Sequence, residues 1–212
     1  MKIFDISMEI HYDMPVYKGR EFKRPVITTD SDFVSGSVYE SRLNMNLHGG
    51  THIDAPLHTI ENGETLDNLP LEKVVTRCKV LDFANVEDKI TEDHLKSKNI
   101  VQGDFVLLKT KSSFLDLEKD FIYLDKTGAQ YLKEKGVKGV GIDSLGIERD
   151  QPGHPTHNTL LGSEIIILEG LRLKDIEEGE YFLVAAPIKI RGVEASPVRA
   201  ILLSELKGEN LK

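Results

Sequence analysis

The sequence predicts one mixed α/β domain with a β-rich centre, and three observations lead to that fold class. Short apolar runs typical of strands outnumber the segments typical of helices. Hydrophobic residues make up 40% of the chain and charged residues 29%, as in ordinary globular proteins. Turn-forming residues are spread evenly, without a linker or an internal repeat. We therefore expect residues 1–212 to form a single domain.

Five runs rich in β-branched residues predict the strands, because each is bounded by Gly, Asp or Lys. They are residues 80–83, 105–110, 137–142, 164–168 and 181–190. Some of these runs alternate between apolar and polar residues, whereas others are solidly apolar. Strands with one wet face and strands buried on both faces are therefore both expected.

Capping signals predict the helices. Residues 91–98 begin at Thr91, which acidic residues follow, as at a helix N-terminus. Residues 126–135 have Asp125 in front and Gly136 just behind, which is typical of a helix with both ends capped. A third, weaker helix is expected over residues 71–77.

Charge and cysteine content exclude several classes of protein. The 27 basic and 35 acidic residues give a net charge of 27 − 35 = −8 without a local basic cluster, so a nucleic-acid partner is not expected. The N-terminal apolar residues are interrupted by Asp5 and Glu9, and no run is long enough to span a membrane, so neither a secretory signal nor a membrane partner is expected. The lone Cys78 excludes a disulfide framework and predicts a reducing, cytoplasmic location. We expect Cys78 to be a small apolar residue in a strand.

Clean alternation over residues 42–48, RLNMNLH, predicts a strand with one polar face. That face runs into a cluster, HGGTHIDAPLH, which contains His48, His52, Asp54 and His58. These four residues share one parity, so an extended backbone points them to one side. A helix would also align His48 with His52, but the glycines, Thr51 and the β-branched Ile53 make a poor helix. We expect a strand that bends at the two glycines.

A bend would bring these side chains to one metal ion. Same-face neighbours on a flat strand are about 6.6 Å apart, whereas ligand atoms lie about 2.0–2.2 Å from a zinc ion. Two imidazoles and one carboxylate form a donor set suited to Zn, Mn or Fe, with positions left open for water. His58 lies two residues after Pro56, so it is either a further ligand or a free acid/base.

The cluster resembles the H-x-G-T-H-x-D-x-P-x-H signature of the cyclase-like metal-dependent hydrolases, which include bacterial kynurenine formamidases and isatin hydrolases. The opening DISMEIHYDMPVYKG is similar to that family, as is the closing third, from GIDS through EGL to AAPIKIRGVEASPVRA. Two stretches depart from the formamidases. The chain has VYKG where they usually have WPGD, and GIDSLGIE where they commonly have GTDTPSVD.

The resemblance implies a swivelling β/β/α fold and a homo-oligomer, a dimer or a tetramer. It also implies that His48, His52 and Asp54 hold a first metal, and that Asp54 bridges to a second held by His157 and Glu169. We expect one or two divalent ions per subunit, with zinc as the first choice and manganese as the alternative.

The same resemblance implies that His58 is the acid/base and that Tyr17 contacts the substrate. Other interpretations stay open at three positions. His154 competes with His157 as a ligand, Glu169 could be a capping or solvated residue, and Tyr17 could be a packed surface aromatic.

Together these features predict a hydrolase for a small-molecule amide, with arylformamide hydrolysis as the leading reaction. Opening of an isatin-like lactam, or another small-molecule cyclase or hydrolase reaction, is the alternative within enzymes. A non-catalytic metal-binding or sensor module with a closed site is the alternative outside them.

Overall fold

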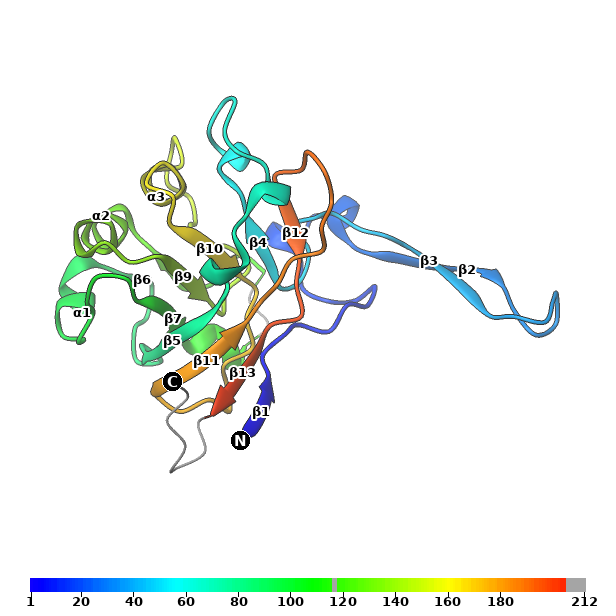
Figure 1. Cartoon of the computed structure of the whole chain (residues 1–212), viewed down its shortest axis with the longest axis horizontal. Coiled ribbons are helices and arrows are strands. Elements are labelled where there is room, and N and C mark those ends of the chain that lie inside the picture. The colour runs from blue at the N-terminus through cyan, green and yellow to red at the C-terminus, as the bar shows by residue number, and fades with distance from the viewer. Residues whose placement is uncertain (116–117, 205–212) are drawn as a thin grey trace.

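The computed structural model describes residues 1–115 and 118–204, and a large mixed sheet forms its centre (Figure 1). Within this part of the chain the sheet has nine strands. Their order is β1 (Lys2–Asp5), β13 (Ile201–Ser204), β11 (Gly179–Val184), β5 (Val75–Asp82), β7 (Phe105–Lys109), β9 (Gly139–Ile142), β10 (Ile166–Glu169), β4 (His52–Asp54) and β12 (Ala195–Pro197). The four strands from β5 to β10 run parallel, and the strands on both sides of them are antiparallel. This arrangement confirms the predicted mixed α/β class.

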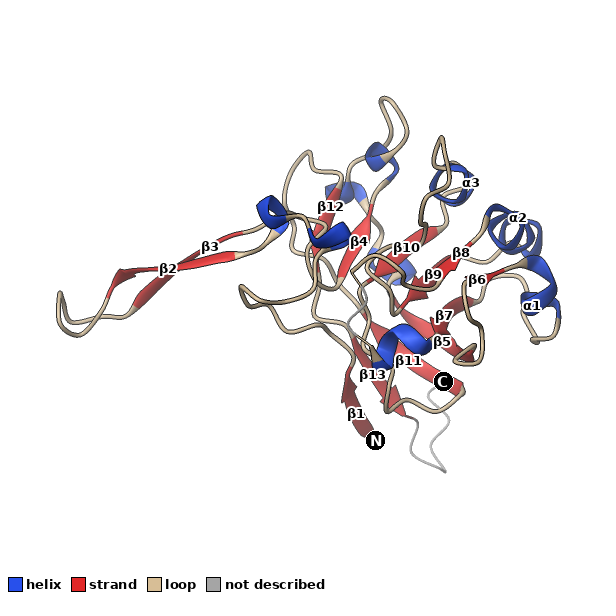
Figure 2. Ribbon diagram, turned by 180° about the vertical axis from the view of Figure 1, so that it is seen from behind, coloured by secondary structure: helices blue, strands red, loops and turns tan. Residues whose placement is uncertain are grey.

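The α-helices lie on one face of the sheet (Figure 2). They are α1 (Glu92–Lys96), α2 (Lys126–Lys135) and α3 (Pro155–Leu161). Both capped helices of the sequence analysis are confirmed. The Asp125 side chain accepts hydrogen bonds from the first turn of α2, and Gly136 ends that helix in the left-handed conformation with φ 66°. Thr91 and His94 form a reciprocal cap at the start of α1.

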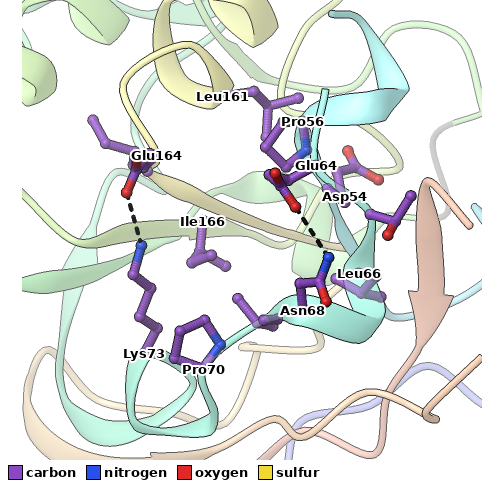
Figure 3. Close-up of a pocket in the computed structure, with 14 residues that line it drawn as sticks. Asp54, Pro56, Glu64, Leu66, Asn68, Pro70, Lys73, Leu161, Glu164 and Ile166 are labelled. Atoms are coloured by element: carbon purple, nitrogen blue, oxygen red, sulfur yellow. Dashed lines mark hydrogen bonds and ion pairs between the residues drawn. The ribbon is translucent and has the colours of Figure 1, made fainter. Parts of the chain in front are cut away.

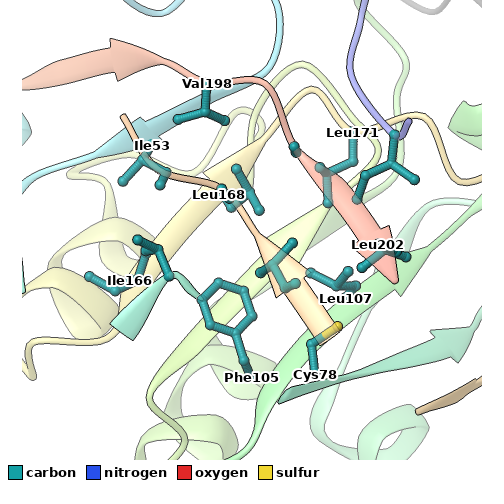
Figure 4. Packing of buried hydrophobic residues seen from close by; sticks show 14 of the residues in the cluster. Ile53, Cys78, Phe105, Leu107, Ile166, Leu168, Leu171, Val198 and Leu202 are labelled. Atoms are coloured by element: carbon teal, nitrogen blue, oxygen red, sulfur yellow. The ribbon is translucent and has the colours of Figure 1, made fainter. Parts of the chain in front are cut away.

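The parallel strands are buried on both faces, because their side chains alternate between two cores. On β7, Phe105 and Leu107 join a core on the face away from the helices, whereas Val106 and Leu108 pack on the helix side. Figure 4 shows the first of these cores, which also contains Cys78. Burial raises the pKa of the Cys78 thiol to about 12, so this cysteine is the apolar strand residue that the sequence predicts.

The helix expected over residues 71–77 is wrong. Only Leu71–Lys73 forms a short 3-10 turn, and β5 begins at Val75. The β-branched run from Val74 to Thr76 favours an extended backbone. Pairing of β5 with both β11 and β7 then stabilises the strand from its two edges.

Strand boundaries shift where the turn chemistry differs from expectation. β11 stops at Val184 instead of continuing to residue 190, since the sequence soon reaches Pro187. β10 starts at Ile166, because Glu164 lies in the left-handed region with φ 57°. The alternating strand over residues 42–48 ends at Asn44.

A hairpin arm formed by β2 (Val26–Ser31) and β3 (Glu40–Asn44) projects from the body of the molecule (Figure 1). β6 (Lys89–Ile90) and β8 (Tyr123–Leu124) form a further small parallel pair. Among the described residues, none of the helices has the length and apolar content needed to cross a membrane.

Candidate active site

The glycine pair makes the bend that leads into β4. Gly50 has φ +66°, which a residue with a Cβ rarely adopts. At Gly49 an added Cβ would lie 2.9 Å from the carbonyl oxygen of Asn46. The Asn46 side chain accepts a hydrogen bond from the backbone N–H of His48 at 3.0 Å. The turn thereby fixes His48 before β4. The expectation that His48 lies on an extended strand is wrong, because β3 ends at Asn44 and His48 stands in this turn.

β4 presents His52 and Asp54 on the same face, because two neighbouring strands fix its register. His52 lies opposite Glu169 of β10, and Asp54 lies opposite Ala195 of β12. The residue between them, Ile53, points into the core on the face away from the helices. The predicted parity is therefore confirmed for the two strand residues.

A 3-10 turn, Pro56–His58, brings His58 back beside the other histidines. The ring centroid of His58 lies 4.1 Å from that of His48 and 5.4 Å from that of His157. His157 comes from α3, so a segment a hundred residues later in the sequence completes the cluster.

Two buried carboxylates, Asp54 and Glu169, occupy the middle of the cluster. The Asp54 carboxylate lies 2.9 Å from Nδ1 of His48, 3.5 Å from Nε2 of His52 and 3.8 Å from Nε2 of His157. The Glu169 carboxylate lies 3.3 Å from Nε2 of His52 and 3.5 Å from Nε2 of His157. Three imidazoles thus converge on two carboxylates.

Several of these nitrogen and oxygen atoms, which could each donate an electron pair to a metal ion, are buried without a hydrogen-bond partner in the described chain. They are Nε2 of His52 and both carboxylate oxygens of Asp54. Buried polar groups are normally satisfied, so such atoms mark a place where a further group belongs. The donor atoms of His52, Asp54 and Glu169 lie within 4.8 Å of one another, and so do those of His48, Asp54 and His58. Imidazole nitrogens and carboxylate oxygens at this spacing fit a divalent metal ion.

The protonation states follow from the opposed charges. Burial alone would lower the pKa of His52 and of His157. Glu169 and Asp54 raise the pKa of His52 to about 9, and Glu148, with Glu169 and Asp54, raises that of His157 to about 10. Burial would raise the pKa of Glu169, yet His157 and His52 hold it well below its usual range. His58 differs, because burial, together with His48 and His157, lowers its pKa. His58 is therefore neutral near pH 7 and can accept a proton.

Glu148 orients His157. The Glu148 carboxylate lies 2.7 Å from Nδ1 of His157 and also accepts a hydrogen bond from the backbone N–H of that residue. Its second oxygen accepts hydrogen bonds from Gln151 and Thr156. The ring is thereby turned so that Nε2 faces Asp54 and Glu169, a common arrangement behind metal-binding histidines.

An open cavity of about 580 Å³ lies over the cluster. His48, His58, His157 and Glu169 line it, and so does Tyr17, whose ring also packs 5.9 Å from that of Phe121. His52 and Asp54 do not line this cavity, being almost fully buried.

A smaller cavity of about 270 Å³ lies near Asp54 and has a mainly apolar lining (Figure 3). Asp54 is one of its lining residues, and four of its other polar side chains pair with each other, Asn68 with Glu64 at 3.0 Å and Lys73 with Glu164 at 3.5 Å. The histidine-lined cavity is therefore the better candidate for chemistry.

The structure brings the residues chosen from the sequence to one place: His48, His52, Asp54, His58, His157, Glu169 and Tyr17. His154 is exposed at the rim, with its ring 6.0 Å from that of His157. Sequence reasoning missed two carboxylates, Glu148 and Glu194. The latter lies 3.3 Å from Nε2 of His48. Glu194 stands in a stretch that carries the family resemblance, which is the signal that could have identified it, whereas Glu148 ends GIDSLGIE, which departs from the formamidases.

The chain is similar to known proteins over most of its length. A family model described as "Putative cyclase" matches residues 4–149. A kynurenine formamidase of Salinibacter ruber is 31% identical over 95% of this chain and 97% of its own length. A solved structure of a potential metal-dependent hydrolase with cyclase activity is 49% identical, with a TM-score of 0.89 over 95% of this chain and 96% of that one.

An isatin hydrolase A of Labrenzia aggregata shares the fold, with a TM-score of 0.84 over 96% of this chain and 94% of its own, at 24% identity. Since the family model covers more than half of the chain and a relative above 30% identity covers nearly all of it, the chain belongs to the cyclase family of metal-dependent hydrolases.

Proposed function

We propose that this enzyme is an arylformamidase, which hydrolyses N-formyl-L-kynurenine to L-kynurenine and formate. The observation that carries the proposal is the set of buried, unpartnered donor atoms beneath a cavity that His58 lines. The relatives named kynurenine formamidase support the choice of an amide over other substrates.

We propose that His48, His52 and Asp54 hold one divalent ion, zinc or alternatively manganese, and that Asp54, His157 and Glu169 hold a second. The buried oxygens of Asp54 support its role as a shared ligand, because both lack a hydrogen-bond partner in the described chain. His157 is preferred to His154, because its Nε2 atom approaches both carboxylates. An ion bound there supplies Lewis acidity toward a carbonyl oxygen and lowers the pKa of water.

His58 moves the proton in this proposal. Its neutral imidazole takes a proton from the attacking water and delivers it to the aniline nitrogen as the amide bond breaks. The ring of His58 packs beside the rings of His48 and His157, and Tyr17 offers an aromatic face to the aryl group.

The hairpin arm supports a homo-oligomer, a dimer or a tetramer. Its strands are exposed along almost their whole length, yet they carry apolar side chains such as Val26, Ile27 and Leu43. Exposed apolar surface of this kind marks a contact with another protein. We propose that a second copy of this chain covers it.

The function is tested by metal analysis of the purified protein and a formamidase assay with the metal found. His58→Ala should retain the metal and lose about 10²–10⁴-fold in rate, as expected for a general acid/base. Asp54→Ala should lose both metal and activity. His11→Ala, an exposed histidine outside the cavity, is the matched control and should behave as wild type.

Two results would reject the proposal. Loss of metal in His58→Ala would make His58 a ligand instead of an acid/base. A protein that binds metal, hydrolyses no formamide and unfolds on chelation would be a structural metal module.

A further inference from the structure

One wall of the histidine-lined cavity is formed by the segment from Tyr17 to Lys23, and this wall is basic. Lys18, Arg20 and Lys23 line the cavity together with Tyr17. The Nζ atom of Lys23 lies 5.5 Å from the centre of the Tyr17 ring, so cation and aromatic face are close together. An aromatic ring flanked by cations is suited to a flat organic anion.

Two of these cations have no acidic partner within residues 1–115 and 118–204. Lys18 pairs with Asp150 at 2.7 Å. Arg20 and Lys23 form no ion pair with any residue that the structure describes. Lys23 is nevertheless half-buried, and burial, with a smaller contribution from Arg20, lowers its pKa. Two neighbouring cations, one of them partly desolvated, would be stabilised by an anion between them.

The acidic groups of the same cavity are already engaged. Of the described acids that line it, Glu148 contacts His157, Asp150 pairs with Lys18, and Glu169 lies between two histidines. Consequently the described lining offers free positive charge to a substrate but no unpaired carboxylate to an ammonium group.

We infer that Arg20 and Lys23 bind a carboxylate of the substrate, and that the preferred arylformamide is a net anion, not a zwitterion. The inference rests on the proposed amide hydrolysis at the histidine cluster and names the class of amide. The guanidinium of Arg20 can bind both carboxylate oxygens, and the aryl ring then lies against Tyr17. His58 lines the same cavity, so the formamide group beside the carboxylate can reach it.

The test compares three formamides on the metal-loaded protein: 2-formamidobenzoate, its neutral methyl ester, and zwitterionic N-formyl-L-kynurenine. Arg20→Gln and Lys23→Gln should each raise KM for 2-formamidobenzoate about 10–100-fold, the range for a lost charged hydrogen bond, with kcat nearly unchanged. KM for the ester should not move. In the wild type, 2-formamidobenzoate should have a lower KM than the zwitterion.

A binding measurement makes the inference independent of turnover. Calorimetry with benzoate and benzamide is run on the wild type, on both variants and on Lys133→Gln, an exposed control on α2. Benzoate should bind the wild type and the control, and at least tenfold more weakly to each cavity variant. Direct ligation of benzoate by the metal is common to all four proteins, so it does not contribute to the difference.

The outcomes separate the two proposals. If formamides are hydrolysed but neither variant distinguishes the anion from the ester, the anion site is wrong and the proposed function stands. If no formamide is hydrolysed but benzoate binding depends on Arg20 and Lys23, the anion site stands and the proposed function fails. Benzoate binding that is absent, or equal in all proteins, overturns the anion site, and a zwitterion with the lower KM overturns the preference for a net anion.

Discussion

At the scale of single residues, the site depends on a carboxylate behind the ligands. Glu148 fixes the ring of His157 and is itself held by Gln151 and Thr156. All four residues come from the stretch that links β9 to α3 and from the helix itself. Glu148 is thus a positioning residue, which acts through His157.

Replacing Glu148 by Gln should weaken metal binding about 10–100-fold, the usual effect of removing a partner behind a metal-binding histidine. The change keeps the side-chain shape but removes the charge that orients Nδ1 of His157. Metal affinity is measured by competition with a chelator, and thermal melting checks that the variant is folded. Glu134→Gln, exposed on α2, is the control. Equal affinity in wild type and Glu148→Gln would show that the contact does not position the ring.

Asp143 is a second buried carboxylate with a measurable signature. It accepts hydrogen bonds from the backbone N–H and hydroxyl of Thr110 and from the hydroxyl of Ser113. Burial nevertheless raises its pKa to about 6 from an ordinary value of 3.8. The folded state therefore binds this proton more tightly than the unfolded state does, and the associated stability is lost as pH rises from about 4 to above 6.

Asp143→Asn should remove this dependence. Between pH 4.5 and pH 7, the free energy of unfolding of the wild type should fall by roughly 2 kcal/mol relative to the variant. Denaturant unfolding at several pH values measures the difference. A constant difference between the two proteins across this range would mean that Asp143 is ionised throughout.

At the scale of elements, a close contact between two chain segments sets the position of the ligands. The hydroxyl of Thr51 accepts a hydrogen bond from the backbone N–H of Met8 at 2.7 Å and donates one to the carbonyl of Gly170 at 2.6 Å. A Cβ on Gly170 would lie 2.3 Å from the carbonyl oxygen of Gly50. The entrance to β4 and the exit of β10 can therefore approach each other only where a glycine stands.

Gly170→Ala should be much more destabilising than Gly103→Ala. Both glycines have positive φ, which costs alanine about 1–2 kcal/mol, but a Cβ on Gly103 meets nothing within 4 Å. The additional loss of unfolding free energy in Gly170→Ala measures the steric overlap with Gly50. Metal binding should also be weaker in this variant, because Glu169 is adjacent. Chemical unfolding and metal titration of both variants measure it. Equal losses would argue against the close contact.

Elements with their own local signals could be predicted from the sequence, whereas those decided by tertiary contacts could not. The ends of α2 are set by Asp125 and Gly136, which act within one turn. Residues 75–77 form the start of β5 because β11 pairs with them, while β7 pairs with the later part of the same strand. Neither β7 nor β11 is adjacent to these residues in sequence, so the local sequence did not reveal the strand.

The same distinction applies to the site. The histidines and aspartate of residues 48–58 lie close in sequence, so the shared face of His52 and Asp54 and the glycine bend could be predicted directly, whereas the turns that place His48 and His58 could not. Arg20, Lys23 and Glu148 come from distant segments that meet only in the folded chain, and each looks like an ordinary charged residue in the sequence. His157 and Glu169 were identified by resemblance and not from their surroundings.

At the scale of the whole molecule, the hairpin arm stands apart from the two cores. Replacing the cross-strand partners Ile27 and Leu43 by Ser should shift the proposed oligomer toward a monomer, since both side chains are about half exposed in the single chain. Light scattering during gel filtration measures the mass. Val101→Ser, an equally exposed apolar residue away from the arm, is the control. A wild-type monomer, or an oligomer that survives the double substitution, would contradict this role for the arm.

The register of β4 also limits where the chain can tolerate the insertion or deletion of a residue. His52 lies opposite Glu169 on one side and Pro197 on the other, and side chains alternate with a period of two. A deletion or insertion of one residue between Gly50 and Asp54 would turn the ligands toward the opposite core. The tip of the arm, residues 32–39, carries no such constraint. Natural variation in chain length should accordingly collect at the arm and avoid the short strand.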